Sequence, residues 1–429
     1  TSILAAFSRT PEMLIASRAL LGLSGATLAP STLSLIRNMF LDPAERTRAI
    51  AVWITSFSVG AAIGPLLGGL VLEFFWWGAA FLISVPVMAL LLILGPRFLP
   101  EFRDPNAGRL DLTSAALSLA AILSVVFGLK QVAQDGFGAV ALSAITVGVV
   151  FGLVFVRRQR TLSDPLIDLG LFRAPGFTPS LAIYGLGIVF VFGGFLFLPQ
   201  FLQLVLGLTP LQAGLWTLPW ALAFVVGSQL TPRLVRRFRA VHLMAAGLAL
   251  AGLAFAILTR IDESTGFGIF VIGTVMFSLG LAPVFTLTND LIIGSVAPER
   301  AGAAAGLSET SAELGGALGI AFFGSIGVAI YRGAIADGIL ATVPAEASEA
   351  ARDTLGGAVE VAGDLPAQVG VPLLDAARDA FVRGVHVSAW IAAIGAIALA
   401  FVTLRTLRDV RPSPEVEVED RGPESALSQ

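Results

Sequence analysis

The chain has 429 residues, of which 56% are hydrophobic and 13% are charged, and its formal net charge at pH 7 is −3. Soluble proteins carry about 25% charged residues, so this composition excludes a soluble globular domain and provides no basic surface for a nucleic acid. Cysteine is absent and only two histidines are present, which excludes disulfides, thiol catalysis and a histidine-based metal centre.

Eleven stretches are apolar and long enough to cross a bilayer as helices, which takes about 20 residues. They cover residues 12–37, 48–75, 77–99, 112–132, 138–156, 177–206, 211–234, 241–258, 267–293, 301–331 and 385–404. Residues 1–8 are apolar without the basic start of a signal peptide, and we expect them to be the end of a further span. The pattern predicts an all-α polytopic membrane protein.

The basic residues are distributed unevenly over the predicted loops. Nineteen of the 27 lie in one set of alternate loops and in the C-terminal tail, seven lie in the other set, and Arg18 lies within a span. Cytoplasmic loops are enriched in Lys and Arg. We therefore expect the first set, and with it the C-terminus, on the cytoplasmic side of the cell membrane.

Two segments of the sequence are too polar to span the membrane. Residues 332–383 form a long outer loop, in which residues 346–361 and 373–382 are amphipathic. We expect a solvated helical hairpin that caps the outer face; a role in partner binding is the alternative. The acidic tail, residues 409–429, has no apolar periodicity and is expected to be disordered.

The second span carries a glycine pattern that predicts close helix packing. Gly60, Gly64 and Gly68 are four residues apart, so they share one helical face, which a neighbouring backbone can approach closely. Pro65 removes a backbone donor and is expected to bend the helix, and Gly69 follows the last of the three glycines. A tightly packed helix without any chemistry is the alternative.

Residues 58–69, Ser-Val-Gly-Ala-Ala-Ile-Gly-Pro-Leu-Leu-Gly-Gly, resemble the antiporter motif of the major facilitator superfamily. In that family this glycine-rich, proline-kinked fifth helix lines the interface between two halves. Residues 18–26, Arg-Ala-Leu-Leu-Gly-Leu-Ser-Gly-Ala, are similar to the motif of its fourth helix, with Gly22 and Gly25 among the small residues. The resemblance implies that Arg18 tunes a proton-carrying acid in the first helix; an interfacial Arg near the outer mouth is the alternative.

The sequence also repeats itself after about 255 residues. Pro-Ala-Glu-Arg at 43–46 recurs as Ala-Pro-Glu-Arg at 297–300, and the glycines at 60, 64 and 69 recur at 315, 319 and 324. Two six-helix halves built from one ancestral unit would give such a repeat. The spans 112–132 and 138–156 lie between the halves and match neither.

The resemblance therefore points to the fourteen-helix branch of the superfamily, which contains drug:proton antiporters of the quaternary-ammonium exporter type. The partners of residues 177–258 in the repeat would precede Thr1, so we expect the chain to lack the first two helices and most of the third. The expected domains are a partial N-terminal bundle at 1–99, two extra helices at 100–160, a C-terminal six-helix bundle at 161–408 and the tail.

Three acidic residues in the predicted spans are candidates for binding substrate or protons, because charges in a membrane are costly and mostly functional. Glu309 and Glu313 are one helical turn apart, and two carboxylates in a low dielectric retain a proton that a cation can displace. The resembling exporters have a Glu and a second acid here, in the thirteenth helix. Acids that face a watery cavity, or that pair with an Arg, are the alternative. Asp290 is the third candidate; an acid at the interface, or one paired with Arg300, is its alternative.

Aromatic residues could form a cavity wall for flat lipophilic cations through cation–π contact. The candidates are Phe195, Trp216, Trp220 and Phe224; packing or lipid contact is the alternative. Several resembling exporters carry an acid in the tenth helix after Leu-Pro, whereas residues 218–224, Leu-Pro-Trp-Ala-Leu-Ala-Phe, have none. This departure favours monovalent or neutral substrates over divalent cations.

The sequence as a whole predicts a monomeric secondary transporter that exports lipophilic cationic drugs in exchange for protons by alternating access. Its expected partners are a small-molecule substrate, protons and the lipid bilayer. An exporter of a neutral or anionic metabolite, and a truncated membrane protein that does not transport, are the alternatives. A nucleophile–base pair, a metal cluster and a P-loop are all missing, so we expect neither an enzyme, nor ATP-driven transport, nor a cofactor.

Overall fold

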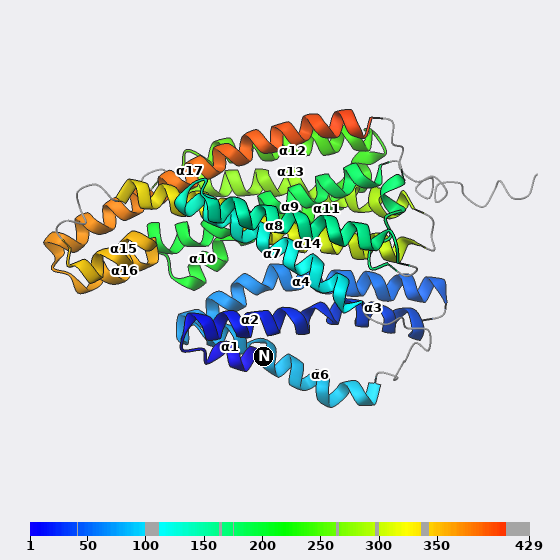
Figure 1. The fold of residues 1–429 in the computed structure, drawn as a ribbon, viewed down its shortest axis with the longest axis horizontal. Helices are drawn as coiled ribbons and strands as arrows, with labels where there is room; N and C mark the ends of the chain where they lie inside the picture. Colours follow the sequence, from blue (N-terminus) through cyan, green and yellow to red (C-terminus); the bar gives the residue numbers. More distant parts are fainter. Residues whose placement is uncertain are drawn as a thin grey trace, which may run out of the picture. The chain divides into compact units, whose positions relative to one another are not determined.

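The computed structural model describes residues 1–40, 42–98, 111–162, 165–174, 176–262, 266–296, 300–335 and 343–408. Within these ranges the chain is helical and forms no strand (Figure 1). The acidic tail at 409–429, expected to be disordered, lies outside the described residues.

The helices group into two compact units. Unit 1 consists of Thr1–Arg109 and Leu208–Ala221, and unit 2 consists of Leu110–Gly207 and Leu222–Gln429. The chain therefore passes from one unit to the other inside a helix, α11 (Leu218–Val235).

Nine helices in the described ranges are long and apolar enough to cross a membrane. They are Ala79–Phe98, Leu112–Val132, Ala139–Gln159, Phe177–Val205, Pro210–Val235, Ala240–Leu258, Phe267–Gly294, Ala301–Ile335 and Ala367–Thr406. These correspond to nine of the eleven predicted spans, although the last helix starts at Ala367 and not at residue 385.

The other two predicted spans are helical but do not meet this criterion within the described residues. The first is divided at Thr27 into α2 (Pro11–Ala26) and α3 (Leu28–Met39). The second is α4 (Pro43–Phe74), one unbroken helix that runs through Pro65 and of which only Ile63–Phe74 counts as an apolar helix. The prediction of eleven full spans is thus met for nine.

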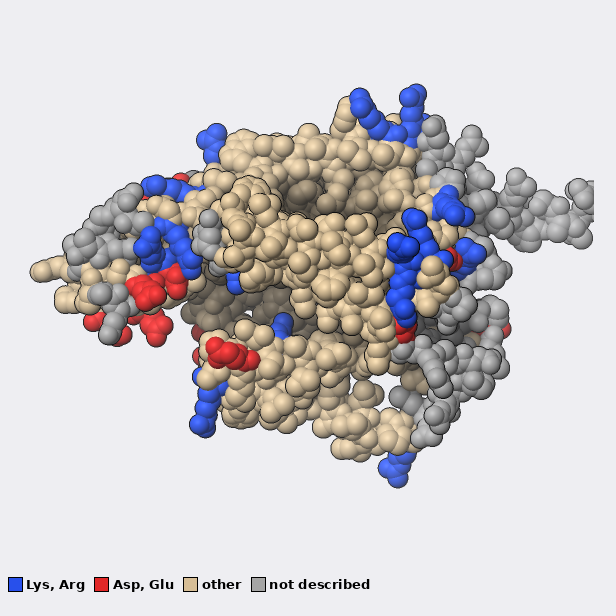
Figure 2. Space-filling view, in the orientation of Figure 1, with Lys and Arg blue, Asp and Glu red and all other residues tan. Residues whose placement is uncertain are grey.

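The surface of the helices suits a lipid environment. Large apolar side chains such as Leu92, Ile93 and Leu153 are more than half exposed. Figure 2 shows charged side chains grouped near helix ends, with a broad uncharged surface between them. Helices satisfy their own backbone hydrogen bonds, which a bilayer requires of any segment that crosses it.

In unit 2, α9 (Phe177–Gln200) and α14 (Ala301–Ile335) pack closely because glycines face the contact. A Cβ atom on Gly315 would lie 2.6 Å from the carbonyl oxygen of Gly185, and one on Gly319 would lie 2.5 Å from that of Val189. Backbone-to-backbone contact of this kind associates helices in membranes. It also fixes which face of α14 turns away from α9.

The two helices between the predicted bundles form a hairpin in unit 2, α7 (Leu112–Asp135) and α8 (Ala139–Gln159), and α7 also packs against α14. A polar network joins the start of α7 to the end of α8. Arg158 donates hydrogen bonds to both carboxylate oxygens of Asp111 at 3.1 Å, and Gln159 donates to the buried Ser114 hydroxyl at 2.8 Å.

This network makes the stability of the hairpin depend on pH. Hydrogen bonds from Ser114 and Arg158 lower the pKa of Asp111 from 3.8 to about 2. The depressed pKa means that the carboxylate stabilises the folded state above about pH 4 and loses this contribution as the pH falls toward 2. We expect Asp111→Asn to lower the thermal unfolding temperature in detergent by a few degrees at pH 7, measured by circular dichroism. The difference from wild type should shrink between pH 4 and pH 2, and a constant difference would contradict the assignment.

The predicted outer hairpin is a packed cap of three helices on unit 2. Its helices are α15 (Ala345–Asp353), α16 (Leu355–Asp364) and the first turns of α17 (Ala367–Thr406) (Figure 1). Two expectations are wrong: the stretch 346–361 is interrupted at Thr354, and the stretch 373–382 continues α17 without a break into the last span.

Small buried residues and polar contacts hold the cap together. Ala351, Ala358 and Ala377 are fully buried, so these helices can approach one another closely. The Tyr331 hydroxyl at the end of α14 donates a hydrogen bond to the Ala351 carbonyl at 2.7 Å, and the neighbouring Arg332 pairs with Asp353 at 2.8 Å.

Candidate functional site

The predicted acidic pair lies on an exposed side of α14, next to the side that packs against α9. Glu309 and Glu313 are both exposed on unit 2, whereas Ser308, Gly315 and Gly319 are buried on the neighbouring side. Glu309 lies about 12 Å along the helix from Ala301, at 1.5 Å per residue. Because a bilayer does not accommodate carboxylates in contact with its tails, this face of α14 is suited to water, protons or a cation.

An aromatic side chain from α9 lies beside this pair. The Tyr184 side chain lies near Ser308 and Glu309 of α14. The Tyr184 ring meets the Phe285 ring of α13 (Gly266–Gly294) edge-on, with centroids 5.6 Å apart. Phe224 of α11, one of the predicted cavity aromatics, lies 6.2 Å from Phe285.

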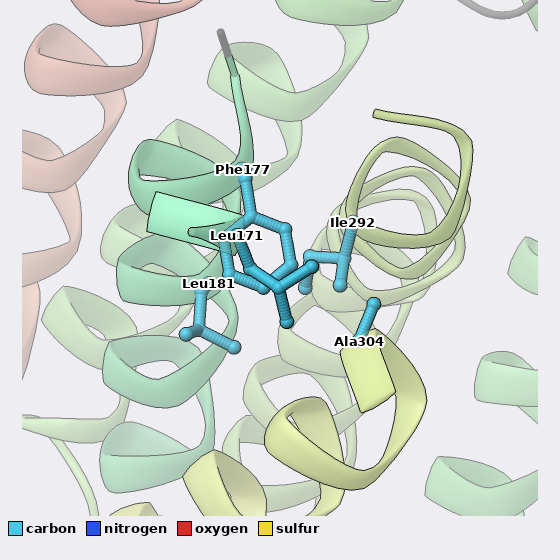
Figure 3. Close-up of a cluster of buried hydrophobic side chains, with 5 residues drawn as sticks. All are labelled: Leu171, Phe177, Leu181, Ile292 and Ala304. Atoms are coloured by element: carbon cyan, nitrogen blue, oxygen red, sulfur yellow. The ribbon is translucent and has the colours of Figure 1, made fainter. Parts of the chain in front are cut away.

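A hydrophobic cluster in unit 2 lies next to Tyr184. It consists of Leu171, Phe177, Leu181, Ile292 and Ala304, whose side chains converge from the 3₁₀ turn η1 (Leu171–Arg173), α9, α13 and α14 (Figure 3). Tyr184 is partly buried and packs against this cluster. The cluster thus anchors the start of α14, and with it the register of the residues that follow.

An ion pair supports the same junction. Arg300, directly before α14, pairs with Asp168 at 3.1 Å, and Asp168 also accepts a hydrogen bond from the Gly170 backbone at 2.8 Å. This Arg belongs to the repeated Ala-Pro-Glu-Arg segment. Asp290, the third predicted acid, is exposed near the end of α13.

In unit 1, the glycine-rich helix α4 packs against the short helix α10 (Pro210–Trp216). A Cβ atom on Gly69 would lie 2.6 Å from the Pro210 carbonyl oxygen, and one on Gly214 would lie 2.7 Å from the Pro65 carbonyl oxygen. The Glu73 carboxylate accepts a hydrogen bond from the Leu211 backbone at 3.4 Å. These reciprocal backbone contacts hold the two helices together.

The close approach predicted at Gly60, Gly64 and Gly68 occurs instead at Gly69. No described atom lies within 4 Å of a Cβ placed on any of the first three. Gly60 and Gly64, together with Ile63, line an open groove of about 480 Å³. Within unit 1, α10 contacts α4 at Gly69 and not on the face of these three glycines.

The remaining candidates are dispersed. Arg18 is exposed on α2, with its guanidinium carbon 5.7 Å from the centroid of the Phe81 ring. Gly22 and Gly25 have no described atom within 4 Å of a Cβ position. The other predicted aromatics are Trp216 and Trp220, which are half-buried in the part of the chain assigned to unit 1, and Phe195 of α9, whose side chain is outside the described part.

Sequence reasoning missed Tyr184, Ser308 and Phe285. They come from three helices, and only the α9–α14 contact at Gly185 and Gly315 brings the first two together. A usable signal was the polar pair Ser308-Glu309 in an otherwise small and apolar stretch, because a hydroxyl inside a span needs a partner.

The comparisons with known proteins agree with this architecture. The Major Facilitator Superfamily profile matches residues 1–320. The multidrug efflux pump LfrA of Mycolicibacterium smegmatis is 43% identical over 401 residues, which cover 94% of this chain and 79% of that protein. The methyl viologen resistance protein SmvA of Salmonella typhimurium is 35% identical over 393 residues, which cover 89% of this chain and 77% of that protein.

A solved structure shares the fold. The bacterial homologue of the human lysosomal transporter Spinster, in an inward-facing and occupied conformation, superposes with a TM-score of 0.60 at 19% identity, over 96% of this chain and 81% of that chain. These findings confirm the predicted family and its all-α transporter fold. The chain belongs to the Major Facilitator Superfamily and is a transporter of its drug-efflux type.

Proposed function

We propose that the protein exports lipophilic cations across the cell membrane in exchange for protons, and that Glu309 binds the proton and the cation in turn. The observation that carries this proposal is the exposed pair of carboxylates on α14, well inside a membrane-spanning helix. A group that must release a proton to accept a cation couples the two movements, provided that it faces one side of the membrane at a time.

The geometry of the pair supports this role. Side chains one turn apart on a helix have Cβ atoms about 6 Å apart, so two carboxylates at Glu309 and Glu313 repel each other when both are ionised. A shared proton, or a bound cation, removes that repulsion. Asp290 is a third acid that a proton could reach, and Arg18 would act on an acid elsewhere in the N-terminal bundle.

The proposed organisation follows the predicted domains. Residues 1–99 and 161–408 belong to two bundles that move against each other, residues 100–160 supply two extra helices, and the C-terminus is cytoplasmic. The functional transporter is a monomer. In this arrangement the contact between α4 and α10 helps to control the movement of the bundles. The contact is made by backbone atoms of both helices, so the helices cannot shift along each other without losing it.

The substrate class is a flat or lipophilic cation. Similarity to the multidrug efflux pump LfrA supports drugs as substrates, and similarity to SmvA adds methyl viologen, a flat dication. The absence of an acid at 218–224 argued against dications, but two carboxylates on α14 provide enough charge for one. Methyl viologen therefore belongs in the test beside ethidium.

The proposal is tested with everted membrane vesicles that contain the complete gene product. Energised vesicles should accumulate ethidium, and a protonophore should abolish the accumulation. Vesicles without the protein are the control. Accumulation that persists with the protonophore, or no accumulation of either cation, would refute proton-coupled cation export.

A further inference from the structure

Tyr184 occupies a fixed position next to the proposed cation site. Its neighbour Gly185 contacts α14 so closely that a Cβ atom would lie 2.6 Å from the Ser311 hydroxyl. Ser311 in turn lies 3.4 Å from the Leu181 carbonyl oxygen, to which it donates a hydrogen bond. These contacts set the register of α9 on α14, and they place Tyr184 at the level of Ser308 and Glu309.

The ring of Tyr184 is held on three sides. Its side chain lies near Ser308, its ring meets the Phe285 ring edge-on, and it packs against the cluster around Leu171. The Tyr184 side chain is half-buried, and the exposed Glu309 lies near it. A rigid aromatic face beside a carboxylate is the arrangement that attracts a flat organic cation.

Two more rings extend this surface. Phe285 lies against Gly187, where a Cβ atom would approach its Cε1 atom to 3.0 Å, so the glycine leaves room for the ring. Phe224 follows at 6.2 Å from Phe285, with its plane tilted by 49°. Tyr184, Phe285 and Phe224, from three helices of unit 2, form a continuous aromatic wall.

We propose that this aromatic wall is the specificity-determining surface of the transporter, and that it selects flat aromatic cations over aliphatic ammonium ions of equal charge. Glu309 neutralises the charge of either cation, whereas only a planar substrate gains contact with the Tyr184 ring. This inference rests on the proposed cation export.

The test compares KM values for two monovalent cations, ethidium and tetrabutylammonium, in vesicles. We expect Tyr184→Leu to raise the KM for ethidium about fivefold to tenfold, the size of one cation–π contact, and to leave that for tetrabutylammonium within about twofold. Tyr184→Phe keeps the ring and should retain most of the ethidium affinity. Phe285→Leu should repeat the selective effect if the Tyr184→Leu protein fails to fold.

The matched control is Phe322→Leu, an aromatic side chain on α14 that is 40% exposed and lies outside the wall. Its KM values should equal those of wild type. Equal increases for both cations in Tyr184→Leu and Phe285→Leu, or no increase for ethidium, would overturn the specificity role. If the wild-type protein transports neither cation when a proton gradient is applied, the proposed function is refuted, and the inference with it.

Discussion

Replacement of Glu309 by Gln is expected to abolish proton-coupled ethidium export. The amide keeps the size of the side chain but has no charge for the cation and no proton to release. Loss of one partner of a desolvated charge pair costs about 2 kcal/mol or more, so transport at low ethidium concentration should fall by more than about tenfold. Initial rates of ethidium accumulation in energised everted vesicles measure this effect.

The control for this variant is Glu360→Gln, the same chemical change at an exposed position of α16 in the outer cap. It should transport ethidium at the wild-type rate. Membrane levels of both variants need to match that of wild type. A Glu309→Gln protein that accumulates ethidium normally, and still loses it on addition of a protonophore, would move the coupling to Glu313, Asp290 or another part of the protein.

Addition of a single methyl group at Gly69 is expected to separate α4 from α10. In Gly69→Ala the new Cβ atom would lie 2.6 Å from the Pro210 carbonyl oxygen and 3.0 Å from the Leu211 Cα atom. Both are backbone atoms, so the helix itself must shift. Overpacking of this kind costs about 1–3 kcal/mol, and we expect a lower unfolding temperature in detergent together with slower export.

Gly363→Ala is the matched substitution, because no described atom lies within 4 Å of its Cβ position on α16. Alanine favours a helix over glycine, so this variant should be as stable as wild type or slightly more stable. Intrinsic tryptophan fluorescence during heating measures the unfolding temperature of each variant. If Gly69→Ala unfolds at the same temperature as Gly363→Ala and exports ethidium at the wild-type rate, the α4–α10 contact does not have the importance assigned to it.

Hydropathy predicted the individual spans well because each must satisfy its backbone internally and face lipid, whatever its neighbours are. Nine of the predicted spans recur as helices, eight of them with similar bounds and the last with an earlier start. The outer segment was predicted less well. Its amphipathic stretches have the correct period, but the break at Thr354 and the continuation of α17 depend on packing among Ala351, Ala358 and Ala377, which no local pattern reveals.

The candidate site was only partly predictable for the same reason. Two acids four residues apart must share a helical face, so the Glu309–Glu313 pair followed from the sequence alone. The aromatic wall did not, because Tyr184, Phe285 and Phe224 belong to three helices that only tertiary packing brings together. Likewise, the spacing of the α4 glycines defined a face, but only the position of α10 decides that Gly69 makes the close contact.

Proton movement coupled to ethidium movement is the most direct test of cation export in exchange for protons. The purified complete gene product is reconstituted into liposomes that contain a pH-sensitive dye, and an ethidium gradient is imposed without any initial pH difference. Ethidium leaving the liposomes should drive protons inward and acidify the lumen, and Glu309→Gln should show no such change. Ethidium movement without a change of internal pH, or an equal change in the Glu309→Gln protein, would contradict the account.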